Sequence, residues 1–168
     1  QGKMQEHLIV DGNNALHAID ELAQELSRDR NQARESLLRM LEPLPAGEGI
    51  RLTVVFDGRG VRPDLSNHSG MEDYTVIYSS SSEGADGIIE RMLMASKAPG
   101  NIVVATNDGL IRNCAYQNGA AAMRVEELIK RLDSSIDQTS RRVRSRSRDK
   151  DGNSPRFENR LPLEGLEP

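Results

Sequence analysis

The sequence predicts an α/β fold in three layers, a parallel sheet covered by helices on both faces. Short apolar runs of strand length alternate with stretches of helical periodicity from residue 6 to about residue 133. Polar or Gly-containing breakers separate the two kinds of segment. Alternation of this kind is typical of a parallel sheet with right-handed crossovers. The single Cys excludes an internal disulfide, and no apolar run approaches the ~18 residues of a membrane helix.

Five short runs are predicted to form the strands. The first four are rich in Val, Ile, Leu or aromatic residues, which favour strands, and polar breakers follow each of them. The fifth is a weaker run of Ala and Met. In chain order, the expected strands are residues 7–10, 52–56, 74–78, 102–105 and 120–123.

The segments between these runs repeat their apolar residues at the spacing of an amphipathic helix. Asn13 or Asn14 can cap the first helix, and Pro43 ends the second. The polar stretch over residues 59–72 is expected to be an exposed loop. In chain order, the helices are expected around the apolar positions of residues 16–26, 33–41, 88–93, 110–115 and 125–132.

The charge is distributed unevenly along the chain. Residues 1–130 carry 13 Lys or Arg and 19 Asp or Glu, a balance of −6, whereas residues 131–168 carry 9 and 7, a balance of +2. We therefore expect a folded domain over residues 1–133 and a basic, mostly disordered tail over residues 134–168, with five arginines between positions 141 and 148. An acidic domain can bind a polyanion only through local features or metal ions.

Four carboxylates are expected at one edge of the sheet. Asp11, Asp57 and Asp108 follow the first, second and fourth strands, and Asp86 stands at the start of the helix after the third. Ligands of open parallel sheets bind beyond the carboxyl ends of the strands. Clustered carboxylates repel one another unless cations are bound or some are protonated. This donor set suits Mg²⁺ or Mn²⁺, which can activate water and stabilise attack on a phosphodiester.

Each of these residues also has a structural interpretation. Asp-Gly is a common turn, and Asp86 and Asp108 stand where Asp is a favoured helix cap. Asn14 either caps a helix or makes hydrogen bonds beside Asp11, and the sequence favours neither. One such carboxylate alone is more often structural, but four at one edge favour a site. The histidines lack metal-ligand spacing, and no glycine-rich phosphate loop follows a strand.

Four short motifs occur in an order that resembles a known group. They are HLIVDGNN, VVFDG, EGADGIIE and VVATND, at residues 7–14, 54–58, 83–90 and 103–108. The set resembles the YacP-like NYN family of PIN-like endoribonucleases over about residues 6–133. The resemblance implies a Rossmann-like (PIN-like) sheet of order 3-2-1-4-5 and a metal-dependent acidic site. It implies Asp11, Asp86 and Asp108 as core site residues with Asn14 beside them, and Asp57 matches a further family position.

Two positions depart from the family pattern. Asn13 stands where the family usually has Tyr, and Gly87 replaces the second Asp of the third motif. The leading hypothesis is a cytoplasmic, Mg²⁺- or Mn²⁺-dependent endoribonuclease acting on single-stranded RNA, without a small-molecule cofactor or a membrane. Because bacterial members are linked to ribosome-associated cleavage of messenger RNA, the ribosome is a candidate partner.

Two other hypotheses stay open, as does the oligomeric state. A non-catalytic RNA- or ribosome-binding module on the same scaffold is favoured by Gly87 and the basic tail. A metal-dependent phosphohydrolase of small molecules is suggested by the two Asp-Gly pairs, but neither pair begins the D-x-D nucleophile pattern of haloacid-dehalogenase-like enzymes.

Overall fold

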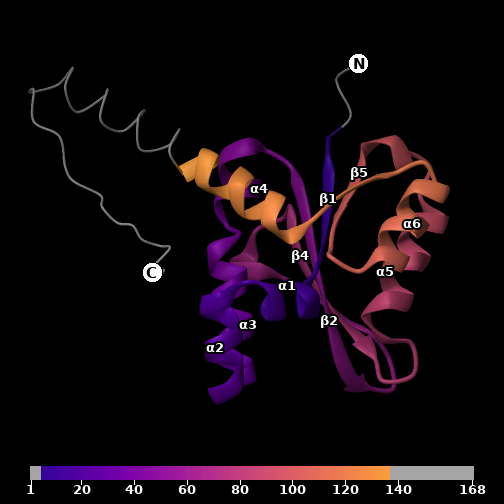
Figure 1. Cartoon of the computed structure of the whole chain (residues 1–168). Helices are drawn as coiled ribbons and strands as arrows, with labels where there is room; N and C mark the ends of the chain where they lie inside the picture. Colours follow the sequence, from indigo (N-terminus) through magenta and orange to yellow (C-terminus); the bar gives the residue numbers. More distant parts are fainter. Residues whose placement is uncertain (1–4, 137–168) are drawn as a thin grey trace, which may run out of the picture.

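A six-stranded sheet forms the centre of the molecule (Figure 1). The computed structural model of the chain describes residues 5–136. The strand order is β3-β4-β2-β1-β5-β6, and every neighbouring pair is parallel except β3 with β4. The five predicted strands therefore take the predicted order 3-2-1-4-5, which confirms the fold class. The strands are β1 (His7–Asp11), β2 (Arg51–Gly60), β3 (Asp64–Asn67), β4 (Tyr74–Ser80), β5 (Ile102–Ala105) and β6 (Ala121–Met123).

The stretch over residues 59–72 is not simply the loop that we predicted. β2 continues to Gly60, and β3 then pairs antiparallel with β4 before a short 3-10 helix, η1 (His68–Gly70). All four residues of β3 are exposed at the edge of the sheet. Because no face of β3 is buried, it lacks the apolar alternation by which a strand is recognised in a sequence.

Helices cover both faces of the sheet, as predicted (Figure 1). One layer contains α1 (Gly12–Ala18), α2 (Asp20–Arg28), α3 (Arg30–Met40), α4 (Pro43–Glu48) and the last helix, over residues 125–136. The other layer contains α5 (Gly84–Ala95) and α6 (Gly109–Gln117), with a 3-10 helix, η2 (Pro99–Asn101), before β5.

The first predicted helix is in fact two helices. Ile19 adopts an extended backbone between α1 and α2, while its amide still donates to the carbonyl of Ala15. The Ile19 side chain is 7% exposed and belongs to the core. The break therefore occurs at a residue whose apolar spacing fits the helical pattern, and for this reason the pattern does not reveal it.

Two apolar cores form because successive strand residues point to opposite faces. Leu8 and Val10 pack under the layer of α1 to α4, whereas Ile9, between them, packs under α5 and α6. Val54 and Val55 divide in the same way. Burial on both faces explains why the central strands read as continuous apolar runs.

The last helix continues through the predicted domain boundary at residue 133 to residue 136, with Ser135 buried. The rest of the predicted tail, including its five arginines, lies outside the described residues. No helix within residues 5–136 has the length and apolar character needed to cross a bilayer.

Candidate active site

The carboxyl ends of β1 and β5 bring Asp11 beside the segment that follows β5. The two strands are parallel neighbours in register from His7 with Ile102 to Val10 with Ala105. The Thr106 hydroxyl, fully buried, donates to Asp11 Oδ2 at 2.9 Å and accepts from the Asp108 amide at 3.0 Å. Thr106 therefore connects the carboxylate of Asp11 to the backbone of Asp108, a residue 97 positions away in the sequence.

Asn14 links α1 to the same segment. Asp11, rather than Asn13 or Asn14, caps α1, and its Oδ1 accepts from the Asn14 amide at 3.4 Å. Asn14 Oδ1 accepts from the Asn107 amide at 2.7 Å. The prediction that an Asn caps this helix is wrong, whereas the prediction that Asn14 makes hydrogen bonds beside Asp11 is in agreement with these contacts.

Asn107 is a site residue that the sequence analysis missed. Its Oδ1 accepts from the Val125 amide at 2.8 Å, at the start of the last helix, and its Nδ2 donates to Glu126 Oε2 at 3.2 Å. Asn107 thus ties the edge that carries Asp108 to a distant part of the chain. The only signal in the sequence was its place in the VVATND motif.

Burial is the main influence on the charge of Asp11, whose side chain is 5% exposed. Loss of solvation raises the pKa of Asp11 to about 6, the bonds from Thr106 and the Asn14 amide oppose this, and the charges of Asp86 and Asp108 add to it. An ionised Asp11 is therefore costly in the folded protein unless a cation is near.

Asp86 and Asp108 present freer carboxylates. Asp108 caps α6, with Oδ1 accepting from the Leu110 amide at 2.9 Å. Asp86 lies in the first turn of α5, is exposed, and makes no hydrogen bond within the described residues. Desolvation and the charges of Asp108, Asp57 and Glu90, in that order, raise the pKa of Asp86. The Asp86 carboxylate therefore lies within electrostatic reach of Asp108, Asp57 and Glu90.

Asp57, like Asp11, accepts protein hydrogen bonds on both of its oxygens, but it is exposed whereas Asp11 is buried. Oδ1 accepts from the Ala85 amide at 2.7 Å, and Oδ2 accepts from Asn13 Nδ2. Since Ala85 precedes Asp86, these bonds fix the turn that carries Asp86. Asp57 also lies inside β2 rather than after it, at an irregularity in the pairing with β4 between Phe56 and Gly60.

The two glycines that follow Asp11 and Asp57 are needed for close packing. A Cβ on Gly12 would lie 2.5 Å from the Phe56 ring, and one on Gly58 would lie 2.1 Å from the carbonyl oxygen of Ser79. Both Asp-Gly pairs therefore mark places where neighbouring elements approach closely, which is a different reason for glycine than the turn that we considered.

The chemistry of the donors, carboxylates without cationic partners, is of the kind that a divalent cation binds partly through water. Within residues 5–136, no three His, Cys, Asp or Glu side chains converge closely enough to hold one ion as they stand. In the same part of the chain, none of the four aspartates forms an ion pair with Lys or Arg. Unneutralised carboxylates suit Mg²⁺, which binds through one or two carboxylates and keeps several waters.

An acidic edge beyond the strands of a Rossmann-like sheet is the arrangement expected of an α/β domain that acts on phosphate esters. The family model described as "YacP-like NYN domain" matches residues 8–167, and the chain belongs to this family. The match extends beyond the motif resemblance, which ended near residue 133, and takes in the arginine-rich segment. Family membership supports a nuclease-type function related to RNA.

Relatives and solved structures agree with this assignment. The chain is 28% identical over 141 residues to the uncharacterized protein YacP of Bacillus subtilis (strain 168), covering 82% of this chain and 81% of the relative. A crystal structure of Rae1 (YacP) from Bacillus subtilis matches with a TM-score of 0.66 at 28% identity, covering 88% of this chain and 84% of that one. A single-residue variant of that protein matches with a TM-score of 0.73 at 25% identity, covering 88% and 87%.

Proposed function

We propose that the chain is a Mg²⁺- or Mn²⁺-dependent endoribonuclease that cleaves single-stranded RNA. The observation that carries the proposal is the group of aspartates at one edge of the sheet, mutually repelling and without cationic partners within residues 5–136. Such an arrangement is unfavourable on its own and favourable around a bound cation.

In this proposal Asp11, Asp86 and Asp108 hold the ion, directly or through water. When bound, it supplies charge stabilisation at the phosphodiester and an activated water for hydrolysis. Thr106 orients Asp11 by donating to Oδ2. Asp57, whose two oxygens accept from Ala85 and Asn13, positions the turn before Asp86.

Asn14 contacts the substrate in the same proposal. Its Oδ1 is held by the Asn107 amide, which fixes the orientation of the side chain. Its Nδ2 makes no hydrogen bond within the described residues and is available to donate to a phosphate oxygen. The substrate we favour is messenger RNA on the ribosome, in the cytoplasm, as the family resemblance implies.

Cleavage of a 5′-labelled single-stranded RNA tests the proposal. The assay compares Mg²⁺, Mn²⁺ and EDTA, and naked RNA with translating ribosomes. Asp86→Asn is the sharpest variant, because Asp86 is exposed and makes no hydrogen bond within residues 5–136, so the fold does not depend on it. Asp20→Asn, which removes an exposed carboxylate from α2, is the matched control.

We expect metal-dependent cleavage that Asp86→Asn abolishes and Asp20→Asn leaves intact. The second candidate, a non-catalytic RNA-binding module, is favoured by Gly87, which leaves the first turn of α5 one carboxylate short of the family pattern. RNA binding without cleavage under every metal and ribosome condition would select that candidate.

A further inference from the structure

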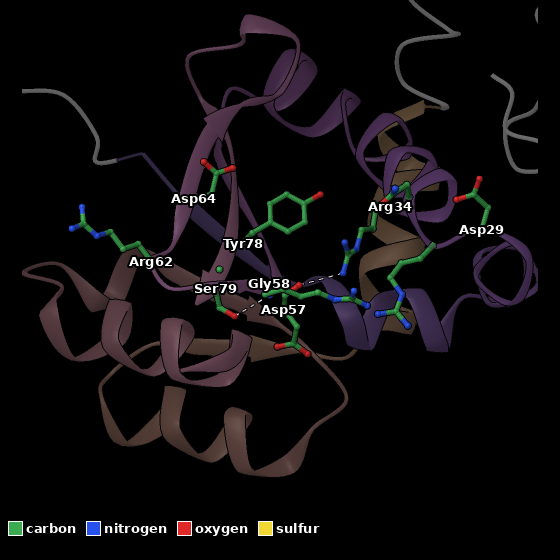
Figure 2. Close-up of a pocket in the computed structure, with 12 residues that line it drawn as sticks. Asp29, Arg34, Asp57, Gly58, Arg62, Asp64, Tyr78 and Ser79 are labelled. Carbon is green, nitrogen blue, oxygen red and sulfur yellow. Dashed lines mark hydrogen bonds between the residues drawn. The ribbon is translucent and has the colours of Figure 1, made fainter. Parts of the chain in front are cut away.

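A cavity of about 700 Å³ lies beside the acidic edge, between the outer part of β2, β4 and the start of α3 (Figure 2). Four arginines line it, Arg30, Arg34, Arg59 and Arg62. They come from two segments of the chain, the first turns of α3 and the end of β2 with the residues that follow. The acidic domain thus concentrates positive charge at one place.

Arg34 is a fixed cation at the base of this cavity. Its guanidinium carbon lies 5.3 Å from the centre of the Phe56 ring and 5.2 Å from that of Tyr78. Its Nη2 donates to the backbone carbonyl of Asp57 at 3.2 Å, and Figure 2 shows this bond. Its Nε is buried without a hydrogen-bond partner. The two rings and the carbonyl hold the charge of Arg34 in one place.

Arg30, Arg59 and Arg62 are exposed and form no ion pair or side-chain hydrogen bond within residues 5–136. Arg30 and Arg59 lie close enough to Arg34 to disfavour its charge electrostatically. Gathered cations that form no ion pair favour an anionic ligand.

Three carboxylates also line the cavity, and the charge of Asp57 favours the charged form of Arg34, but none of the three forms an ion pair with an arginine within residues 5–136. Asp57 directs its oxygens to Ala85 and Asn13, and Asp29 caps α3 by accepting from the Gln32 amide at 3.2 Å. The third carboxylate, Asp64, is exposed on β3 and forms no ion pair within the described residues. The four arginines and three aspartates leave the lining with a net charge of +1, within a chain whose net charge is −4.

Asp57 joins the cavity to the acidic edge. Its backbone carbonyl binds Arg34, while its carboxylate holds the amide of Ala85, next to Asp86. A strand of RNA that places one phosphate at Asp86 passes this residue on its way to the arginines. Tyr78 is not a free stacking platform, because Arg34 covers it and Phe56 packs at 5.4 Å between ring centres.

We propose that this cavity binds the phosphate backbone of the RNA strand beside the phosphodiester that is cleaved. Arg30 and Arg59 contact the phosphates, and Arg34 is a positioning residue that holds the outer part of β2. The inference rests on the proposed function. Because its contacts are to phosphates and not to bases, it supplies affinity without sequence preference.

The experiment measures RNA binding separately from cleavage. In the Asp86→Asn background, without divalent metal, binding of a fluorescein-labelled single-stranded RNA of mixed sequence is followed by anisotropy over a range of KCl concentrations. The pocket variant adds Arg30→Gln and Arg59→Gln. The control adds Arg51→Gln and Lys97→Gln, which remove the same charge from exposed positions near the amino ends of β2 and β5, at the opposite edge of the sheet.

We expect the pocket variant to lose at least about tenfold in affinity at 100 mM KCl and the control less than about twofold. The slope of log K against log salt should fall by roughly 1.4 in magnitude, as for two phosphate contacts on a single strand. Equal losses in the two variants would overturn the inference and indicate diffuse attraction. Thermal melts confirm that both variants are folded.

The outcome separates this inference from the proposed function. If the parent cleaves RNA while pocket and control variants bind equally, the cavity is not a subsite and the proposed function stands. If no condition gives cleavage but the pocket variant alone loses binding, the subsite stands and the nuclease assignment fails.

Discussion

The two Asp-Gly pairs of this chain have the same sequence and different roles. Asp11 pairs with Val55 in the register of β1 with β2, so Asp57 lies two residues further out along the neighbouring strand. Asp11 is buried and held by Thr106 and the Asn14 amide, whereas Asp57 is exposed and binds Asn13 and Ala85. Strand register therefore sets how deeply each carboxylate is buried. A buried carboxylate such as Asp11 is ionised at a cost in free energy, whereas an exposed one such as Asp57 can fix a neighbouring turn through hydrogen bonds.

The largest expected difference between the pairs is in catalysis. Asp11→Asn removes a carboxylate at the proposed metal site and should reduce RNA cleavage on the order of 10³-fold, as expected for loss of a group that stabilises charge. Asp57→Asn acts only by loosening the turn before Asp86 and should cost about 10- to 100-fold. Single-turnover cleavage at saturating protein measures both. Equal losses would place the two carboxylates in the same role.

The next difference is in the pH dependence of stability. The folded pKa of Asp11, about 6, lies above the ordinary value of 3.8, so the folded protein keeps a proton that the unfolded chain has lost between these values. Its contribution to stability is therefore present below about pH 4 and is lost by pH 6, a change of roughly 3 kcal/mol. Urea unfolding of metal-free protein at pH 4, 5, 6 and 7 measures it.

Asp11→Asn should abolish the fall in the free energy of unfolding between pH 4 and pH 6. The variant should therefore be as stable as the parent, or more stable, at pH 7. Asp57→Asn leaves Asp11 in place, so this variant should lose stability between pH 4 and pH 6 as the parent does. If the free energy of unfolding varied with pH in the same way in the parent and in Asp11→Asn, the result would contradict a costly buried charge on Asp11.

The glycines should behave alike although the carboxylates differ. Gly12→Ala meets the Phe56 ring and Gly58→Ala meets the backbone of Ser79, so each should lower the free energy of unfolding by about 1–3 kcal/mol. Gly58→Ala should be the more damaging, because its Cβ would lie 2.1 Å from the Ser79 carbonyl oxygen, whereas the backbone oxygen nearest to a Cβ on Gly12, that of Val55, is 2.8 Å away. Gly100→Ala, where no atom lies within 4 Å, is the control and should change stability by less than about 0.5 kcal/mol. A neutral Gly58→Ala would show that β2 and β4 can separate there.

The smallest expected effect is stabilisation by metal. Mg²⁺ at ten times its Kd should add about 1.4 kcal/mol to the stability of the parent, because it binds only the folded state. Asp57→Asn should keep most of this gain and Asp11→Asn should lose it. Thermal melts with and without Mg²⁺ provide the measurement. A gain shared by all three proteins would place the ion elsewhere.

The elements recognised from the sequence are those whose burial leaves a periodic signature. The central strands and the carboxylates after them follow from apolar runs buried on both faces, as Ile9 and Val10 illustrate. β3 has no buried face, and the break at Ile19 preserves helical spacing, so neither leaves a signal.

Contacts between segments that are distant in the chain are the second kind of feature that the sequence did not predict. The cavity around Arg34 depends on where α3 meets β2, and the hydrogen bond between Asn14 and Asn107 joins α1 to the segment that follows β5. The spacing of Arg30 and Arg34 by four residues put both on one face of a helix, but nothing in the sequence indicated that Arg59 would face them.

The antiparallel β3 also has a consequence for association between copies of the chain. Without it, β4 would present Tyr74–Ser80 as an open border, a seven-residue strand rich in β-branched and aromatic residues. Such a border is a template for strand addition by another molecule and hence for aggregation. The four residues of β3, Asp64-Leu65-Ser66-Asn67, occupy that border and replace it with a shorter one that carries a charge and two polar side chains. At the other side the sheet ends on β6, only three residues long. The polar stretch over residues 59–72, which we predicted to be a loop, therefore protects the edge of the sheet from pairing with other copies of the chain.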